Sequence, residues 1–170
     1  MLNSIAGSAR ALALGLALIA GPAAGLSATA MAAPAQASAV FDANCSMCHQ
    51  LGATGVPGQF PRLAGRAGRI AATAAGRDYL EHVVLYGMMG TITVDGQPIV
   101  GGVMPPFASL SDDDLAAALN YVISLDDSGK VHGKGAAITP AEIARVRAGK
   151  PSSPIEVHQL RAKAVGKKAS

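Results

Sequence analysis

We expect the chain to fold as one all-α domain. Apolar residues recur at helical spacing in three stretches, 35–49, 78–86 and 111–125, and strand signals are almost absent. The 170 residues suit one modest domain with additions at its ends. Half of the residues are hydrophobic, yet the chain has no Trp, three Phe and three Tyr, so a core of its small side chains lacks bulk. We infer that part of the apolar content lies outside the domain and that a large apolar ligand fills the core.

The N-terminal stretch, 1–33, has the pattern of a secretory signal peptide. A decapeptide with one positive charge precedes an unbroken apolar or Gly run over 11–20, and a Gly-Pro pair ends that run. The small-x-small triplet Ala30-Met31-Ala32 places the mature start near Ala33 or Pro34. An uncleaved membrane anchor is the alternative, but the run is about half of the ~20 residues that span a bilayer. We therefore expect export to a bacterial periplasm or its equivalent.

The first expected helix, 35–49, places four side chains on one face: Ala37, Val40, Phe41 and Cys45. The next segment, 50–76, is rich in Gly and Pro, so we expect mostly loop there, with a short helix around 69–75. A loop of this length inside a compact domain needs a physical reason. Wrapping the edge of a bound ligand is a sufficient one.

The second expected helix, 78–86, ends at Gly87, which suits a left-handed C-terminal cap. Glu81 and His82 are expected on its polar face. Its larger side chains divide between two sides, with Leu80, Val83 and Val84 on one and Tyr79 and Tyr86 on the other.

A small β-hairpin is expected over 91–100, around Asp95-Gly96, with a proline that limits its second strand to an edge. The segment that follows, 101–107, cannot be helical, because two consecutive prolines fix φ and keep the residue before them extended. That residue is Met104, which is therefore expected on a stiffened loop.

The third expected helix, 111–125, has the clearest signals. Ser111 and Asp114 stand as N-cap and N3 of a near capping box, and an acidic first turn complements the helix dipole. The expected buried stripe consists of Leu115, Ala118, Leu119 and Val122.

Beyond Asp127 the composition changes, and we expect a basic C-terminal extension over 128–170. It begins with a Gly/Lys linker and continues with a short helix from Thr139 to about Ala148; a Pro-Ser-Ser-Pro break then precedes an end that is either a weak basic helix or disordered. Residues 34–127 carry four arginines against nine acidic residues, whereas the extension carries nine basic residues against two. Such an extension suits its own acidic domain, an anionic membrane surface or an acidic partner, and composition does not choose among them.

The stretch Cys45-Ser46-Met47-Cys48-His49 is the pattern of a c-type haem attachment site. The two thiols add to the two vinyl groups of one haem, and the adjacent imidazole then binds the iron. A zinc site needs about four ligands, and the chain has two Cys and four scattered His. A redox dithiol of the thioredoxin type belongs between a strand and a helix, whereas this motif ends a helix. A structural disulfide is the third alternative, and haem is the interpretation we favour.

The iron then has one open axial position. The candidate ligands are Met47, Met88, Met89, Met104, His82, His132 and His158. Met47 is held between the cysteines and cannot reach the other face. Met88 and Met89 follow a helix end and are expected in the core, while His82 is expected in solvent. Met104 lies far enough along the chain after His49 to reach the opposite face, so we favour it.

These residues resemble the monohaem class I c-type cytochromes, over about 37–125. Phe41 and Ala37 resemble the family's N-terminal helix, and Tyr121 the aromatic residue of the C-terminal helix that packs on it. Pro61-Arg62-Leu63-Ala64-Gly65 is similar to the family's Pro-x-Leu-x-Gly segment, and Met104-Pro105 to its methionine-ligand loop.

The resemblance implies a fold in which the N- and C-terminal helices cross around one covalently bound haem. It also implies that the Pro61 carbonyl accepts the Nδ1 proton of His49, which orients a ligand imidazole. Three features depart from the family pattern: no Trp is present to hold a haem propionate, the hairpin is an insertion before the methionine loop, and the extension has no counterpart in the minimal fold. Arg62, Tyr86 or a backbone amide is expected to replace the Trp.

We therefore expect a signal peptide at 1–33, a cytochrome domain at 34–127 and the C-terminal extension at 128–170. His49 and Met104 are the expected axial ligands, and a thioether opposite an imidazole favours ferrous iron and leaves no site for oxygen. The expected function is single-electron transfer between exported redox proteins, with no substrate converted and no nucleic acid bound. Two alternatives stay open: a dedicated subunit of a dehydrogenase or oxidase complex, and a haem module that binds a gas.

Overall fold

The structure is a computed structural model that describes residues 34–132 and 137–166. The expected signal peptide and part of the expected linker, 133–136, lie outside the described residues. Within that part of the chain, no helix is both long and apolar enough to cross a membrane.

The N-terminal helix that the sequence predicts is present, but it is divided at Cys45. Helix α1 spans Pro34–Asn44 and α2 spans Ser46–His49. Cys45 between them stays in the right-handed helical region, but its φ of −119° is more negative than that of a regular helix. The Cys45 N–H still donates to the Phe41 carbonyl (2.8 Å), so the chain passes the bend with its hydrogen bonds kept.

The loop region that follows holds two short helical pieces and then a longer helix. The short pieces are η1 (Leu51–Ala53) and α3 (Ala67–Ala71), the second of which begins and ends earlier than we expected. Helix α4 (Ala74–Tyr86) begins before the expected start at Asp78, because the Thr73 side chain accepts a hydrogen bond from the Gly76 N–H (3.0 Å) and caps it. It ends at Gly87, as predicted, with a positive φ of 71°.

Two small antiparallel sheets follow. Strands β2 (Ile92–Val94) and β3 (Gln97–Ile99) form the predicted hairpin. The second sheet was not predicted: β1 (Met88–Met89) pairs with β4 (Val103–Met104), so that Met88 lies opposite Met104. The methionine loop is therefore held on both sides, by a strand partner before it and by prolines after it.

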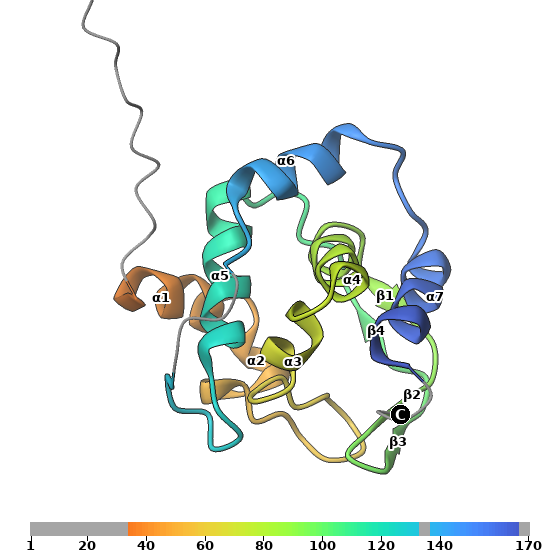
Figure 1. The fold of residues 1–170 in the computed structure, drawn as a ribbon. Coiled ribbons are helices and arrows are strands. Elements are labelled where there is room, and N and C mark those ends of the chain that lie inside the picture. Colours follow the sequence, from red (N-terminus) through yellow and green to blue (C-terminus); the bar gives the residue numbers. More distant parts are fainter. Residues whose placement is uncertain (1–33, 133–136, 167–170) are drawn as a thin grey trace, which may run out of the picture. The chain divides into compact units, whose positions relative to one another are not determined.

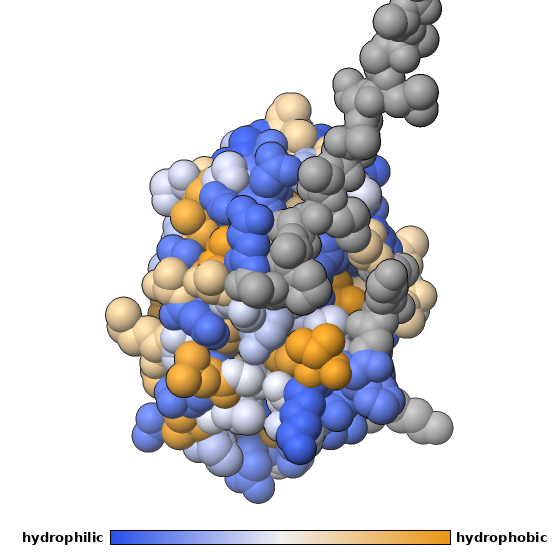
Figure 2. Space-filling model, turned by 90° about the vertical axis from the view of Figure 1, so that its left-hand side faces the viewer, coloured by the Kyte–Doolittle hydropathy of each residue, from blue (hydrophilic) through white to orange (hydrophobic). Residues whose placement is uncertain are grey.

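Helix α5 (Asp112–Ser124) crosses α1, as Figure 1 shows. Ser111 caps it by accepting from the Asp114 N–H (3.1 Å), and every member of the predicted stripe is buried. The Phe41 and Tyr121 rings meet at the crossing with centroids 5.2 Å apart. On the face drawn in Figure 2, apolar residues form separate patches between hydrophilic ones.

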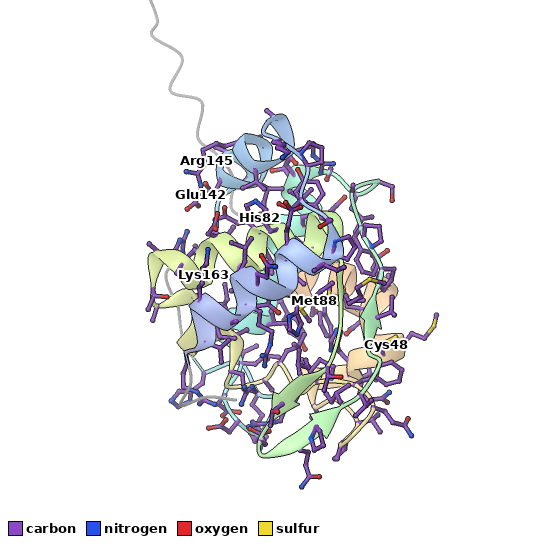
Figure 3. The ribbon with its side chains drawn as sticks, turned by 90° about the vertical axis from the view of Figure 1, so that its right-hand side faces the viewer. Cys48, His82, Met88, Glu142, Arg145 and Lys163 are labelled. Carbon is purple, nitrogen blue, oxygen red and sulfur yellow. The ribbon has the colours of Figure 1, made fainter. Side chains whose placement is uncertain are left out.

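The C-terminal extension folds onto the rest of the protein. Its helices α6 (Pro140–Ala148) and α7 (Pro154–Val165) both begin with a complete capping box. Helix α7 packs along α4, and α6 packs against α5 and α4 (Figures 1 and 3). Three aliphatic side chains of the extension are fully buried: Ile138, Ile143 and Val157. Of the two outcomes left open for the end of the chain, the helical one is present through Val165.

This packing overturns one expectation about α4. Glu81, expected on a polar face, is only 1% exposed, because α6 lies over it. His82 is partly buried, and its Nδ1 lies 2.7 Å from the Asp78 carbonyl oxygen of its own helix. The polar face of α4 is therefore an internal surface.

Candidate functional site

The bend between α1 and α2 carries the cysteine pair. Cys45 and Cys48 are both free and half-buried, so no disulfide joins them. Burial, and then the neighbouring Cys48, raise the pKa of the Cys45 thiol to about 11. The His49 N–H donates to the Cys45 carbonyl (3.0 Å), which holds the imidazole one turn away from the first thiol.

The His49 ring is buried and has one ring nitrogen already engaged. Its Nδ1 lies 2.9 Å from the Pro61 carbonyl oxygen, the contact that the family resemblance implies. A carbonyl can only accept, so the proton sits on Nδ1 and the Nε2 lone pair is left for a metal. Burial lowers the pKa of His49, an effect that the bond to Pro61 partly offsets, so the imidazole is neutral at neutral pH.

The loop that brings Pro61 to His49 is fixed by close backbone packing. The Gly55 N–H donates to the His49 carbonyl (2.8 Å), and the Leu63 N–H donates to the Ala53 carbonyl (2.9 Å). Gly55 has a φ of +68°, and a Cβ there would lie 2.5 Å from the Arg62 nitrogen. Only glycine fits at that point, because both the φ and the space exclude a side chain.

Met104 lies on β4, far along the chain from the cysteines. Its neighbour Val103 is largely exposed on one face of the strand, whereas Met104 on the other face packs against the core. Gly87 makes room for this strand, because a Cβ there would overlap the Met104 carbonyl oxygen. The sequence did not predict the pairing of β1 with β4, because strands of two residues are too short to show an alternating pattern.

The alternative ligands are engaged or placed elsewhere. Met88 is buried, as expected, and the Tyr79 hydroxyl donates to its Sδ (3.8 Å). Met89 was expected in the core as well, and this was wrong: it is 42% exposed, because its strand turns it outward beside Val103. Met47 is 88% exposed.

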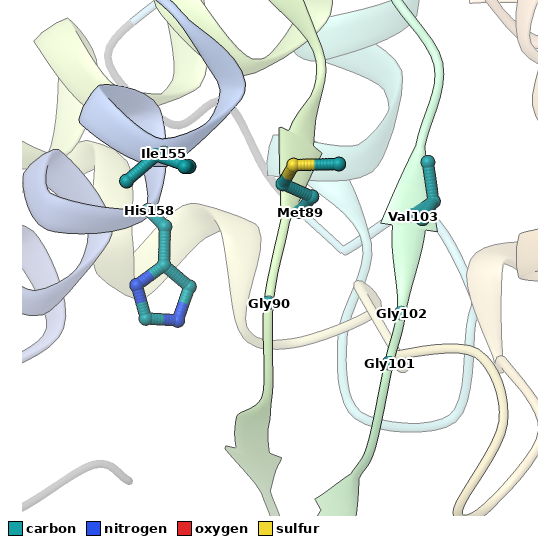
Figure 4. Close-up of a pocket in the computed structure, with 7 residues that line it drawn as sticks. All are labelled: Met89, Gly90, Gly101, Gly102, Val103, Ile155 and His158. Atoms are coloured by element: carbon teal, nitrogen blue, oxygen red, sulfur yellow. The ribbon is translucent and has the colours of Figure 1, made fainter.

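His158 belongs to a hollow on the outer side of the β1–β4 pair. Met89, Val103 and Ile155 line this hollow with His158 (Figure 4). The His158 Nε2 lies 2.8 Å from the Thr91 carbonyl oxygen, so this histidine anchors α7 to the chain between the two sheets.

The donor set fits a haem and not a zinc ion. Two free thiols, one imidazole with its Nε2 available and one thioether on a separate loop are what a covalently attached haem requires. Within residues 34–132 and 137–166, no three or more Cys, His, Asp or Glu side chains cluster as metal ligands, so the zinc alternative has no ligand set there.

Tyr86, one of the groups expected to hold a propionate, has its hydroxyl bound to the C-terminal extension. The Tyr86 hydroxyl donates to the Val146 carbonyl of α6 (3.0 Å), so it fastens the extension instead. Arg62 reaches two carboxylates, Asp95 (2.9 Å) and Asp127 (2.8 Å).

Comparison with known proteins identifies relatives of this chain. The family model described as Cytochrome c matches residues 34–126. Cytochrome c-552 of Thermus thermophilus is 40% identical over 121 residues, which cover 71% of this chain and 81% of that protein. A second cytochrome c-552, from a particular strain of Thermus thermophilus, is also 40% identical over 121 residues, covering 71% of this chain and 72% of that protein.

Proposed function

The chain belongs to the cytochrome c family, and from this membership we propose which residues hold its haem and how they serve electron transfer. It is an electron-transfer haem protein, with a c-type haem attached through Cys45 and Cys48. We propose His49 and Met104 as the two axial ligands and Pro61 as the residue that orients His49.

The bound haem supplies a one-electron ferric/ferrous couple, and the chain sets the conditions under which that couple operates. Pro61 holds the His49 ring with its Nε2 lone pair free, so that His49 would bind the iron through Nε2. Met104 would add a neutral thioether, which favours the ferrous state and raises the potential. An iron bound by both residues would leave no site for oxygen or a substrate, which suits an electron carrier.

The observation that carries this proposal is the 2.9 Å contact between His49 Nδ1 and the Pro61 carbonyl oxygen. It fixes the tautomer in which Nε2 is the metal donor, and it does so at a buried ring beside two thiols. The paired strands support the second ligand, because they leave the Met104 backbone little freedom to move away.

Absorbance spectra and a redox titration of the purified haem protein test the ligand assignment. The wild type is expected to be low-spin in both oxidation states and to show the weak red band of methionine coordination. Met104→Ala is expected to lose that band, become high-spin and bind carbon monoxide, whereas the exposed-methionine control Met89→Leu keeps the wild-type spectrum. A wild type that is high-spin and shifts with carbon monoxide would make the protein a gas-binding module instead.

We propose that the protein is a diffusing carrier between exported redox partners and not a fixed subunit. The extension is the segment that would attach a subunit, and several of its charged side chains bind the rest of the chain instead. Arg147 donates to Asp112 (2.8 Å), and Glu142 accepts from Arg77 (2.7 Å). Co-purification with a large redox protein that is lost when the chain is truncated after Asp127 would favour the subunit alternative.

Export is proposed from the N-terminal sequence alone. Expression in a bacterium with a periplasm, followed by N-terminal sequencing of the haem protein, tests it. A start near Ala33 or Pro34 in the periplasmic fraction is the expected result, and a protein that keeps Met1 and pellets with membranes would indicate the anchor.

A further inference from the structure

We propose that Arg161 of the C-terminal extension, together with Tyr79, holds a haem propionate, so that the extension is part of the haem site. This role rests on the proposed function, since ligation by His49 and Met104 defines the two faces of the haem. The two side chains meet between the loops that carry those ligands, in a region with an excess of positive charge.

The loop on the His49 face leads directly into a group of charged side chains. Pro61 accepts the His49 bond, and the next residue, Arg62, extends to Asp95 at the tip of the β2–β3 hairpin. Arg66 donates to the same carboxylate (2.9 Å). This region therefore borders the side of the haem that His49 binds.

Tyr79 approaches the same hairpin from the Met104 face. Its ring is buried on α4, and its hydroxyl reaches the sulfur of Met88, whose strand partner is Met104. Arg161 of α7 donates to the Tyr79 hydroxyl and to the Thr93 carbonyl of the hairpin (3.0 Å). The guanidinium and the phenol thus meet between the loops that carry the two axial ligands.

The charges at this place do not balance. We define the arginine cluster as Arg62, Arg66, Arg69 and Arg161, together with the two carboxylates that bridge its first three members, Asp95 and Asp127. Among the residues that the structure describes, the four cations and two anions of this cluster sum to a formal charge of +2. In the described part of the chain, Arg161 donates to a carbonyl and a phenol, neither of which is charged.

A half-buried guanidinium without a carboxylate is costly, because desolvation disfavours its charge. The pKa of Arg161 is lowered first by burial and also by the nearby Arg66. An anion at this place would offset both effects by stabilising the charged form, and the planar guanidinium suits a carboxylate.

A haem brings two carboxylates, at the edge opposite its two vinyl groups. With the two vinyl groups bonded to Cys45 and Cys48, the propionates would lie at the haem edge away from these cysteines. The arginine cluster follows the His49 loop through Arg62, reaches the hairpin through Arg161, and has two more cations than anions among the described residues. Arg161 supplies N–H donors to one propionate there, and Tyr79 supplies its single O–H in place of its long contact with the Met88 sulfur (3.8 Å).

Arg161→Gln tests this, with Lys163→Gln as the control, because Lys163 is an exposed cation close to Arg161 on the same helix. Both variants are prepared as haem proteins, and the midpoint potential is measured from pH 5 to 8. The wild type and Lys163→Gln are expected to give matching profiles. Arg161→Gln is expected to rise more steeply in potential as pH falls, because a propionate that has lost its cation takes up a proton and its negative charge no longer favours ferric iron.

Infrared spectra of wild-type protein with isotope-labelled propionate carboxylates give a second readout that needs no variant. One propionate is expected to stay ionised to below pH 5. A wild type in which both propionates titrate within the range, or matching profiles for the two variants, would overturn the proposal. The red methionine band is recorded on the same samples, so a failure of Met104 ligation is seen separately from a failure at the propionate.

Discussion

Gly87 stands where α4 meets the strand pair that carries Met104, and two constraints act on it at once. Its φ is +71°, and a Cβ would overlap the Met104 carbonyl oxygen. Gly96, at the tip of the hairpin, has nearly the same φ of +76° but no atom within 4 Å of its Cβ position. Substitution of Gly96 therefore measures backbone strain alone, whereas substitution of Gly87 measures backbone strain and a steric clash together.

Gly96→Ala is expected to cost about 1 kcal/mol of unfolding free energy, the cost of a left-handed residue with a side chain. Gly87→Ala is expected to cost several times more and to displace the Met104 strand. Denaturant unfolding gives the energies, and the red methionine band reports the ligand. An intact band in Gly87→Ala would show that the strand does not depend on this contact.

Glu81 is a buried carboxylate whose surroundings do not favour its ionised form. Burial raises its pKa first, and Glu142 raises it further, against the opposing effects of Arg145 and Arg77. Its hydrogen bond to Arg145 is long (3.4 Å), and the Arg145 side chain is 71% exposed. The folded protein thus holds a proton here at a pH where the unfolded chain releases it.

The sign of the pH dependence follows from that raised pKa. Its contribution to stability is fully present below the ordinary Glu value and is lost as pH rises through the raised value. Glu81→Gln cannot ionise, so it is expected to gain stability relative to the wild type between pH 4.5 and pH 7. Urea unfolding at both values measures the difference, with exposed Asp42→Asn as the control. An advantage for Glu81→Gln that shrinks at pH 7 would contradict the assignment.

At the level of the elements, capping residues explain which helices could be foreseen. Ser111 and Thr139 each have an acidic residue three positions on, and the helices they start were predicted from the sequence. Thr73 has Gly76 in that place, so the sequence places the start of α4 too late. The pairing of β1 with β4 joins two dipeptides on either side of the hairpin, a tertiary contact that no local pattern encodes.

The residues of the candidate site also divide into those that the sequence predicts and those that only the tertiary structure reveals. Cys45, Cys48 and His49 follow from spacing in the sequence, Met104 from its place on a proline-stiffened loop, and Pro61 from the family resemblance. Arg161 could not be singled out, because it lies far from His49 along the chain, in a segment whose composition left open a weak helix or disorder. Only the packing of α7 on α4 brings it to Tyr79.

Arg147 fixes α6 to the start of α5. It donates to the Asp112 carboxylate and to the carbonyls of Leu110 (2.9 Å) and Ala108. Arg147→Ala is expected to lower the free energy of unfolding by about 2 kcal/mol, because it removes several charge-assisted hydrogen bonds to partly buried partners. Lys150→Ala removes an exposed cation just beyond the same helix and is expected to change the unfolding free energy by less than about 0.5 kcal/mol. Denaturant unfolding measures both variants. If Arg147→Ala and Lys150→Ala lowered the free energy of unfolding equally, Arg147 would act only through its charge.

For the molecule as a whole, the extension behaves as part of the core. Truncation after Asp127 removes the fully buried Ile138, Ile143 and Val157 and uncovers Glu81. At ~1.5–3 kcal/mol for each buried aliphatic side chain, the loss is expected to be roughly 5 kcal/mol. Denaturant unfolding of the truncated haem protein measures it, and a loss below about 1 kcal/mol would mean that the extension is an appendage.

The crossing of α1 with α5 also determines when the protein can finish folding. The two helices lie far apart in the sequence, and their pairing must close a long loop before the Phe41 and Tyr121 rings meet. A chain that emerges N-terminus first exposes both cysteines long before α5 arrives. During that interval the thiols are more accessible for haem attachment than in the folded protein, where both are half-buried.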